Sequence, residues 1–316
     1  MTAAEHDTAT ATDRPREAVS PKPVVVGYDG SPSASAAVDW AAAAAVQWHT
    51  SLQVLTAVDY SAVPVRPGAS AEHLRDVAMD QARSVAEEGV SRAVSAAAGV
   101  HAVSSPAAGG AAGAMVEASR RASLLLLGRA EHGAFTSALL GARSLTVIAH
   151  ARCPVVLVPT GPVLTPGPGR PVVIGVDGSP AATAALGFAA GFADSWGAPL
   201  SVLSVWQVPS SETWARAYWD AAQDDSGLHS AKRERAEQIL REAVSLVHAD
   251  HPDLEITGEA VEGRAGQALA AASADAGVVV VGSRGHGGFT GMLLGSVSHA
   301  VLHAAGGPVA VIQPNP

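Results

Sequence analysis

Cysteine, aromatic residues and charge are all scarce in this sequence of 316 residues. Cys153 is the only cysteine, so no disulfide can form within the chain and we expect a reducing compartment. Aromatic residues make up 4% of the chain and charged residues 16%, whereas 48% of the residues are apolar, which is enough to bury a sizeable core. The length suits two ordinary domains better than one.

Clustered positive charge and long apolar runs are also missing. Lys and Arg total 20 against 29 Asp and Glu, a net charge of −9, which argues against nucleic acid as a partner because phosphate backbones are bound by clustered cations. No apolar run approaches the length of about 18 residues that a membrane span needs. Residues 1–22 lack the apolar segment of a signal peptide and have the composition of a disordered tail. We expect a soluble, cytoplasmic protein that binds neither nucleic acid nor membrane.

The chain consists of two related halves. VVVGYDGSPSA from Val24 aligns with VVIGVDGSPAA from Val172, and LLLLGRAEHGAFTSALLGARS from Leu124 aligns without gaps with VVVVGSRGHGGFTGMLLGSVS from Val278. We therefore predict one domain at 23–159 and a second at 172–316. They are joined by a linker at 160–171, whose density of Pro and Gly cannot sustain helix or strand.

Short runs of Val, Leu and Ile alternate with longer segments of helical periodicity in each half. This alternation predicts strands buried on both faces and joined by helices, as in a parallel sheet. We expect two tandem doubly wound α/β domains with five strands each. In the second half the expected strands are Val172–Val176, Leu200–Val205, Leu254–Ala260, Val278–Gly282 and Val309–Ile312. The expected helices there are Pro180–Trp196, Ser230–Ala249, Arg264–Ala274 and Ser296–Ala305.

The repeated motifs follow the first and fourth expected strands, and doubly wound sheets bind ligands beyond the carboxyl ends of their strands. After the fourth strand of the second half the spacing is Gly282-x2-Gly285-x9-Gly295-Ser296. Glycines let main-chain N–H groups approach an anion, and a helix starting at Ser296 offers further N–H groups to a phosphate. These residues predict a phosphate-binding loop. A flexible loop followed by a serine cap explains them equally well.

Signatures of other nucleotide-binding proteins and of hydrolases are absent from the sequence. Without GxxxxGK[ST] the chain is not a P-loop NTPase, and without GxGxxG after the first strand a dinucleotide-binding domain is disfavoured. An α/β-hydrolase would lack its nucleophile, because no GxSxG elbow occurs.

The order of strand, DGS turn and helix, together with Gly-x2-Gly-x9-Gly-Ser after four valines, resembles the ATP-binding subgroup of the universal stress protein family. The likeness covers the chain after residue 22, in two copies. It implies a Rossmann-like fold, similar to the adenine nucleotide alpha hydrolases, in which the glycines and the Gly-Ser pair wrap the triphosphate. It also implies an Asp beside the ribose and adenine, and backbone contacts to adenine from a Val at the end of the second strand. The candidate ATP-binding residues in the second half are Gly175, Asp177, Val205, Gly263, Gly282, Arg284, Gly285, Gly295, Ser296, Val297 and Ser298.

The first half carries an altered copy of the loop. Glu131 stands where the second half has Gly285, and Ala142 stands where it has Ser296. A lost hydrogen bond to a charged group costs about 1.5–3 kcal/mol, and a carboxylate beside a phosphate adds roughly 1–4 kcal/mol of repulsion. We therefore predict ATP affinity at least about a hundredfold weaker in the first half. Candidates there for a ligand without terminal phosphates are Asp29, Val58, Gly128 and Gly141.

Three functions remain open at this point. The leading hypothesis, implied by the resemblance, is an ATP-binding stress-response or regulatory protein whose nucleotide state alters its assembly or partner binding. The alternatives are a slow ATPase or nucleotide hydrolase, for which we recognise no catalytic residues, and a ligand-free tandem scaffold. Mg²⁺ accompanies many triphosphates, but no carboxylate pair marks a metal site.

The last strand of each half follows a proline, which suits the edge of a sheet. In relatives that strand pairs domains into dimers. We therefore expect the two halves to form an intramolecular pseudo-dimer, and a further homodimer stays open.

Overall fold

The computed structural model describes residues 21–59, 70–129, 141–162, 164–207, 225–285 and 294–313. In the first half the elements are β1 Val24–Gly27, α1 Pro32–Gln47, β2 Ser51–Val58, α2 Ala71–Ala96, β3 His101–Ala108, α3 Ala111–Ser119, β4 Leu124–Arg129, α4 Ala142–His150 and β5 Val155–Pro159. In the second half they are β6 Val172–Gly175, α5 Pro180–Trp196, β7 Leu200–Trp206, α7 Asp225–Asp250, β8 Ile256–Glu262, α8 Ala265–Ala272, β9 Val278–Gly282, α9 Ser296–Ala304 and β10 Val309–Ile312. The two halves thus repeat one order of strands and helices.

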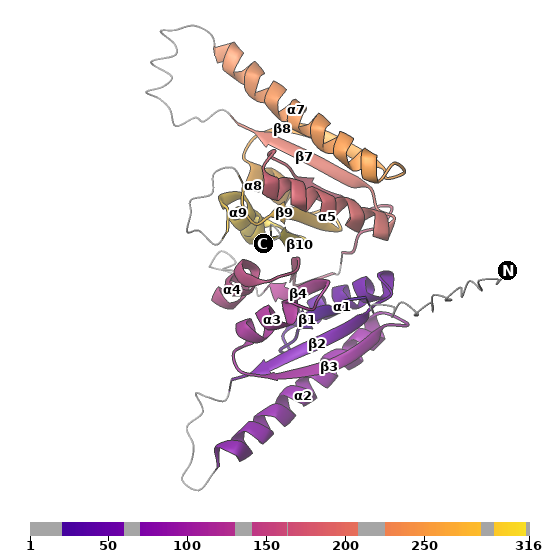
Figure 1. Ribbon diagram of the computed structural model, residues 1–316, viewed down its shortest axis with the longest axis vertical. Helices are drawn as coiled ribbons and strands as arrows, with labels where there is room; N and C mark the ends of the chain where they lie inside the picture. Colours follow the sequence, from indigo (N-terminus) through magenta and orange to yellow (C-terminus); the bar gives the residue numbers. More distant parts are fainter. Residues whose placement is uncertain are drawn as a thin grey trace, which may run out of the picture.

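All described strands belong to one sheet, in the order β3-β2-β1-β4-β5-β10-β9-β6-β7-β8. Within each half the strands are parallel, and the halves join where β5 runs antiparallel to β10. Figure 1 shows the second half above the first along the longest axis, with α2 and α7 at the two far ends. The expected doubly wound order of five strands in each half is confirmed, and the two halves form the predicted pseudo-dimer by joining their strands into one continuous sheet.

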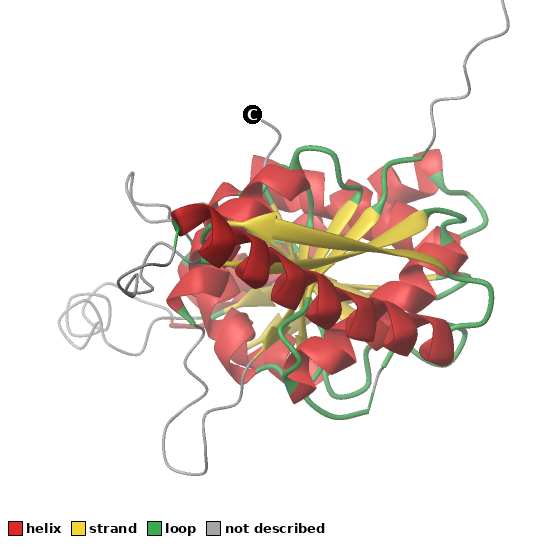
Figure 2. Ribbon diagram, turned by 90° about the horizontal axis from the view of Figure 1, so that it is seen from below, coloured by secondary structure: helices red, strands yellow, loops and turns green. Residues whose placement is uncertain are grey.

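Helices cover both faces of this sheet (Figure 2). On one face the core includes residues of α1 and α5, and the valines and leucines of the strands beneath them. On the other face it includes residues of α3, α4, α8 and α9. The valine and leucine runs are buried because each strand is covered on both sides, as continuous apolar strands require. None of the helices in the described residues is long and apolar enough to cross a membrane.

The DGS turn starts the first helix of each half in the same way. Ser179 caps α5, since its Oγ accepts a hydrogen bond from the Ala182 N–H at 3.2 Å, and Pro180 occupies the first turn. The preceding Gly178 has φ +79°, a left-handed conformation that favours glycine. Ser31 and Pro32 repeat the arrangement at the start of α1. The turn therefore fixes where the chain leaves the sheet beside β6 and β1.

Aromatic side chains hold the two halves together on one face. The Trp40 ring of α1 stacks on Phe192 of α5, with centroids 6.0 Å apart, and Trp48 meets Phe192 edge-on at 5.3 Å. The indole N–H groups are also paired: Trp48 Nε1 donates to Ser195 Oγ at 3.0 Å, and Trp40 Nε1 donates to the Leu164 carbonyl of the linker at 2.9 Å. Aromatic pairs contribute about 0.5–1.5 kcal/mol beyond the area they bury.

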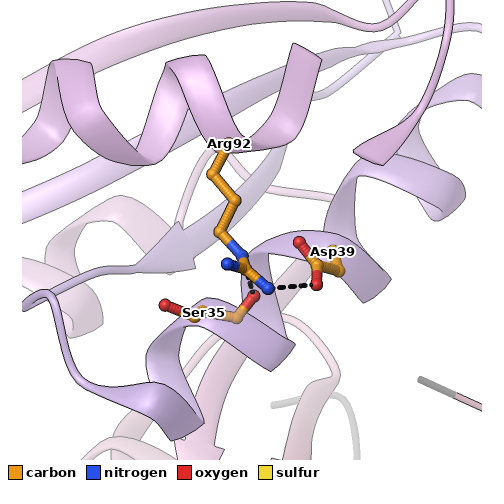
Figure 3. A network of polar contacts seen from close by, with 3 residues as sticks. All are labelled: Ser35, Asp39 and Arg92. Carbon is orange, nitrogen blue, oxygen red and sulfur yellow. Dashed lines mark hydrogen bonds and ion pairs between the residues drawn. The ribbon is translucent and has the colours of Figure 1, made fainter. Parts of the chain in front are cut away.

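The two halves differ in how their long outer helix is attached. In the first half Arg92 of α2 donates to Asp39 Oδ2 at 2.5 Å and to the Ser35 carbonyl at 3.0 Å, both on α1 (Figure 3). The hydrogen bond to Asp39 raises the pKa of Arg92, so this guanidinium stays charged. The matching position in α5 is Gly187, and the contact of α7 with the second-half core is apolar, through residues such as Ile239.

Candidate functional site

A cavity of about 310 Å³ lies at the carboxyl ends of the strands in the second half. It is bounded by the ends of β6, β7 and β9 and by the first turns of α5, α8 and α9. Because β6 pairs with β7 on one side and with β9 on the other, the chain direction across the sheet reverses here, which is where doubly wound folds form ligand crevices. The lining residues are Gly175, Val176, Asp177, Ala182, Leu203, Val205, Ala265, Leu269, Val281, Gly282, Arg284, Gly285, Leu294, Gly295, Ser296, Val297 and Ser298.

The structure brings together ten of the eleven second-half candidates, and Gly263 is the exception. The N–H of Gly263 donates to the Trp206 carbonyl at 2.8 Å, so it closes the turn after β8. Sequence reasoning missed the apolar wall of the cavity, which includes Leu203, Leu269, Val281 and Leu294. The available signal was the strand alternation, which carries Leu203 and Val205 to the same side of β7.

Gly285 lies close to the carboxylate of Asp177. A Cβ added to Gly285 would lie 2.6 Å from Asp177 Oδ2, so a larger residue there would require the Asp177 side chain to move. The other carboxylate oxygen, Oδ1, accepts a hydrogen bond from the Ser179 N–H at 2.9 Å and so belongs to the DGS turn. Asp177 therefore has a structural function, and it also presents a carboxylate at the mouth of the cavity.

The other two loop glycines, Gly282 and Gly295, differ in how closely neighbouring atoms approach them. A Cβ on Gly282 would lie 3.1 Å from the Ala181 carbonyl oxygen, so close packing of β9 against the start of α5 favours glycine. Gly295 has φ −71° and its nearest neighbour for a Cβ would be 3.5 Å away, an ordinary contact. The fold alone therefore does not demand glycine at 295, and the bare backbone leaves the start of α9 open to the cavity.

Hydrogen bonds at the neck of the loop decide which amides face the cavity. The Gly295 N–H donates to the Ser283 carbonyl at 2.8 Å, and the buried Ser298 hydroxyl donates to the Gly295 carbonyl at 3.0 Å. Both donors are thus occupied within the protein. The N–H groups of Ser296, Val297 and Ser298 have no hydrogen-bond partner among the described residues, as expected in the first turn of a helix. These three amides and the exposed Ser296 lie at one end of the cavity.

Val205 offers its backbone to the cavity. The Val176 N–H donates to the Leu203 carbonyl at 2.9 Å, so Leu203 faces β6. By alternation the backbone of Val205 faces the same side, where β6 has already ended at Gly175. Its N–H and C=O groups can therefore pair with the edge of a flat heterocycle.

In the first half, the register of strand pairing shows that the residue equivalent to Val205 differs from the one we predicted. Tyr28 donates to the Leu55 carbonyl as Val176 does to Leu203, so Ala57 is the counterpart of Val205. The Val58 carbonyl instead accepts the Gly109 N–H at 2.8 Å on the β3 side. Our placement of Val58 as the counterpart was therefore wrong by one residue, because valine at the strand end misled the alignment.

The first half has a cavity of its own, of about 570 Å³. Three of its candidates, Asp29, Gly128 and Gly141, line this cavity, and Val58 does not. Glu131 lies outside the described residues. Arg129 and Arg143 are among the lining residues that were not predicted, and they replace Ser283 and Val297 of the second half. The first half thus lacks the glycine and serine of the second-half loop, and it has two arginines beside the cavity instead.

Comparisons with known proteins agree with this architecture. The family model described as the universal stress protein family matches residues 21–159 and 169–313. The chain is 34% identical to universal stress protein Rv2623 of Mycobacterium tuberculosis over 299 residues, which cover 92% of this chain and 96% of that protein. Universal stress protein Rv2005c of the same organism is also 34% identical, over 296 residues and with the same coverage.

Among solved structures, a universal stress protein from Archaeoglobus fulgidus superposes with a TM-score of 0.68 at 20% identity. The match covers 92% of this chain and 98% of that one, which shows a shared fold. The chain is therefore a tandem α/β protein with a cavity at the switch point of each half, and it belongs to the universal stress protein family.

Proposed function

We propose that the second half binds ATP in its cavity and that the chain acts as a cytoplasmic stress-response regulator, in which bound nucleotide alters assembly or partner binding. The observation that carries this proposal is the start of α9, where three amides without a partner among the described residues, together with Ser296, line a cavity that Arg284 also lines. Helix N-termini attract phosphate through such N–H groups and through the helix dipole.

The rest of the cavity suits the other parts of the nucleotide. The apolar wall around Leu203 and Leu269 can receive a planar base, the Val205 backbone can pair with the edge of the base, and Asp177 can accept hydrogen bonds from ribose hydroxyls. The volume of about 310 Å³ lies at the lower end of the range for ligand pockets. Mg²⁺ would bind through the phosphates rather than through a carboxylate set of the protein.

Regulation is favoured over efficient hydrolysis by the chemistry of the lining. Asp177 is the one carboxylate among the described lining residues, and one of its oxygens is committed to the DGS turn. A general base needs a geometry that positions a water for attack. We therefore expect ATP turnover well below the rate of about 1 s⁻¹ at which ordinary enzymes begin.

Isothermal titration of ATP into the wild type, Gly285→Glu, Ser296→Ala, their double variant and one control variant tests the proposal. Gly285→Glu places a side chain against Asp177 and adds a carboxylate, and Ser296→Ala removes a hydroxyl donor. We expect Ser296→Ala to weaken ATP about tenfold or more, and the double variant to abolish measurable binding at the second-half site. Gly187→Glu is the matched control, because it adds the same side chain at an exposed position of α5 that does not line the cavity.

Unchanged ATP affinity in the double variant would refute the proposal. Light scattering of the wild type with and without saturating ATP then examines the regulatory part. The proposal expects a nucleotide-dependent change in oligomeric state or in partner capture, and identical behaviour in both conditions would reduce the chain to a nucleotide-binding scaffold.

A further inference from the structure

We propose that a groove between the two halves binds a small organic anion, with a phosphate or carboxylate head and an apolar body. This groove, which we call the junction groove, has a volume of about 460 Å³. The first half contributes residues 149–154, which lead from α4 into β5, and the second half contributes α5, Arg284 and the end of β10. The proposal does not rest on ATP binding in the second-half cavity.

Contacts between the two halves fix the walls of the junction groove. The Gln313 side-chain amide, at the end of β10, donates a hydrogen bond to the Ile148 carbonyl of α4. The Arg152 N–H donates to Ser119 Oγ at 2.9 Å, which holds the backbone between α4 and β5 in place. Because these walls are already ordered, a ligand would bind without a large loss of conformational freedom in the protein.

Positive charge gathers around the junction groove. Arg152, Arg284 and His150 line it, and all three are exposed. Their side chains make no hydrogen bond or ion pair with a described residue, so they are free to turn toward a bound anion. No Asp or Glu is among the described residues that line the groove. Cys153 adds no negative charge at pH 7, because burial raises the pKa of its thiol to about 12.

The end of α4 opposes this positive charge only in part. A helix carries the equivalent of about −0.5 elementary charge at its C-terminus, and α4 ends at His150, beside the groove. One of its last carbonyls, that of Ile148, is already paired with Gln313. Two guanidinium groups outweigh the remaining partial charge, and arginine binds phosphate and carboxylate through paired N–H donors.

Apolar residues line the rest of the junction groove and call for an organic body on the ligand. Phe188 of α5 is half-buried, and its ring lies 5.3 Å from that of Phe192, which belongs to the aromatic contact between the halves. Ala184 of α5 and Pro154, which precedes β5, also line the groove. Its volume falls within the usual range for small-molecule sites. An inorganic ion would leave this apolar surface unused.

The internal repeat shows that the fold does not require these cations. The positions equivalent to His150, Arg152 and Arg284 hold Ala304, Gly306 and Ala130. The turn from α9 into β10 nevertheless forms the same hydrogen bond, since the Gly306 N–H donates to Ser273 Oγ at 2.8 Å. One side of the junction therefore carries three cationic or titratable side chains that the same turn does without on the other side.

Titration of phenyl phosphate into the nucleotide-free chain at pH 7 tests the proposal, because this probe joins a phosphate head to an apolar ring. We expect one probe to bind per chain in the junction groove, with inorganic phosphate and phenol at least about tenfold weaker. Benzoate, measured in parallel, distinguishes the two heads: tighter binding of phenyl phosphate assigns a phosphate head, tighter binding of benzoate assigns a carboxylate, and either supports the site.

Two variants locate the bound probe. Arg152→Ala removes a charged donor and should weaken phenyl phosphate at least about tenfold. Ala184→Glu adds a carboxylate at an exposed position that lines the groove, and it should abolish measurable binding there. Arg284 is left unchanged because it also lines the second-half cavity.

Each variant has a matched control. Arg75→Ala removes an exposed arginine of α2, and Gly187→Glu adds a glutamate to α5 outside the groove. Both controls should leave the affinity for phenyl phosphate unchanged.

Unchanged affinity in Arg152→Ala and Ala184→Glu would overturn the site. Inorganic phosphate binding as tightly as phenyl phosphate would overturn the need for an apolar body, and phenol binding as tightly would overturn the need for an anionic head. Loss of the probe in Ser296→Ala, with binding intact in Arg152→Ala, would place it in the second-half cavity and overturn the proposal. Failure of the ATP proposal is seen separately, as absent ATP binding in a chain that still binds phenyl phosphate.

Discussion

The two cavities of this universal stress protein have similar apolar walls and differ at the end that lies beside the loop after the fourth strand. In the second half Arg284, Ser296 and Val297 line this end, and in the first half Arg129, Ala142 and Arg143 do. Under our proposal the backbone amides of α9 and the Ser296 hydroxyl bind the phosphates of ATP in the second half, as helix N-termini do. A duplicated fold can therefore carry different side chains at a few loop positions on an unchanged sheet.

Phe192 lies at the aromatic contact that joins the two halves, and its replacement is expected to have the largest effect on stability. Phe192 is 3% exposed and contacts Trp40 and Trp48 of the other half. Phe192→Ala should destabilise the chain by about 3–5 kcal/mol, as truncation of buried aromatic residues does. Urea unfolding provides the measurement, with exposed Leu246→Ala as a control expected to stay within about 0.5 kcal/mol. A loss below about 1 kcal/mol would mean that the aromatic contact does not bind the halves together.

The first loop glycine of each half is expected to differ in its tolerance of a side chain. A Cβ on Gly128 would lie 2.3 Å from the Ser33 carbonyl carbon, whereas on Gly282 it would lie 3.1 Å from the nearest atom. Gly128→Ala should therefore cost roughly 3 kcal/mol and Gly282→Ala about 1 kcal/mol of unfolding free energy. Thermal or urea unfolding of the two variants measures these losses. A larger loss for Gly282→Ala than for Gly128→Ala would contradict the close packing of β4 on α1.

Two serines of α9 separate binding from structure. The Ser298 hydroxyl donates to the carbonyl of Gly295 and is 2% exposed, while Ser296 is exposed at the cavity. Ser298→Ala should lower the free energy of unfolding by about 1 kcal/mol and change ATP affinity little. Ser296→Ala should weaken ATP binding and leave the free energy of unfolding nearly unchanged. Equal loss of ATP affinity in both variants would show that the Ser298 hydroxyl contacts the nucleotide directly.

Cys153 gives the smallest expected effect and reports on the first half alone, because its counterpart is Gly307. Burial raises the pKa of the Cys153 thiol to about 12. Since the unfolded pKa is lower, this burial contributes stability that is present below the unfolded value and is lost as the pH rises towards 12. At pH 8 the native thiol should react with iodoacetamide far more slowly than the urea-unfolded chain does. Equal rates would show that the packing around Cys153 opens readily.

The bounds of a helix or strand were predicted correctly where a capping residue and the apolar pattern indicate the same end. The predicted helix Pro180–Trp196 matches α5, because Ser179 caps its start and Gly197, with φ +56°, ends it. The strand predicted from Leu254 begins instead at Ile256, since Leu254 belongs to a turn in which its N–H donates to the His251 carbonyl. An apolar residue in a buried turn cannot be distinguished from a strand by pattern alone.

The spacing of glycine and serine correctly predicted which loop residues line the second-half cavity. It could not predict the residue at the end of β2, because that depends on the register of strand pairing. Val58 was chosen by residue type, but the pairing of β1 with β2 places Ala57 at the cavity. Arg129 and Arg143 were missed because a repeat comparison that looks for a motif records losses and overlooks new side chains. Their proximity to one cavity follows only from the folded arrangement of β4 and α4.

A crystal structure of the chain grown with excess ATP and Mg²⁺ tests the central claim most directly. We predict a triphosphate within hydrogen-bonding distance of the amides of Ser296, Val297 and Ser298, with the base against Leu203 and Leu269. A second-half cavity that stays empty, or a nucleotide bound elsewhere on the chain, would contradict the account.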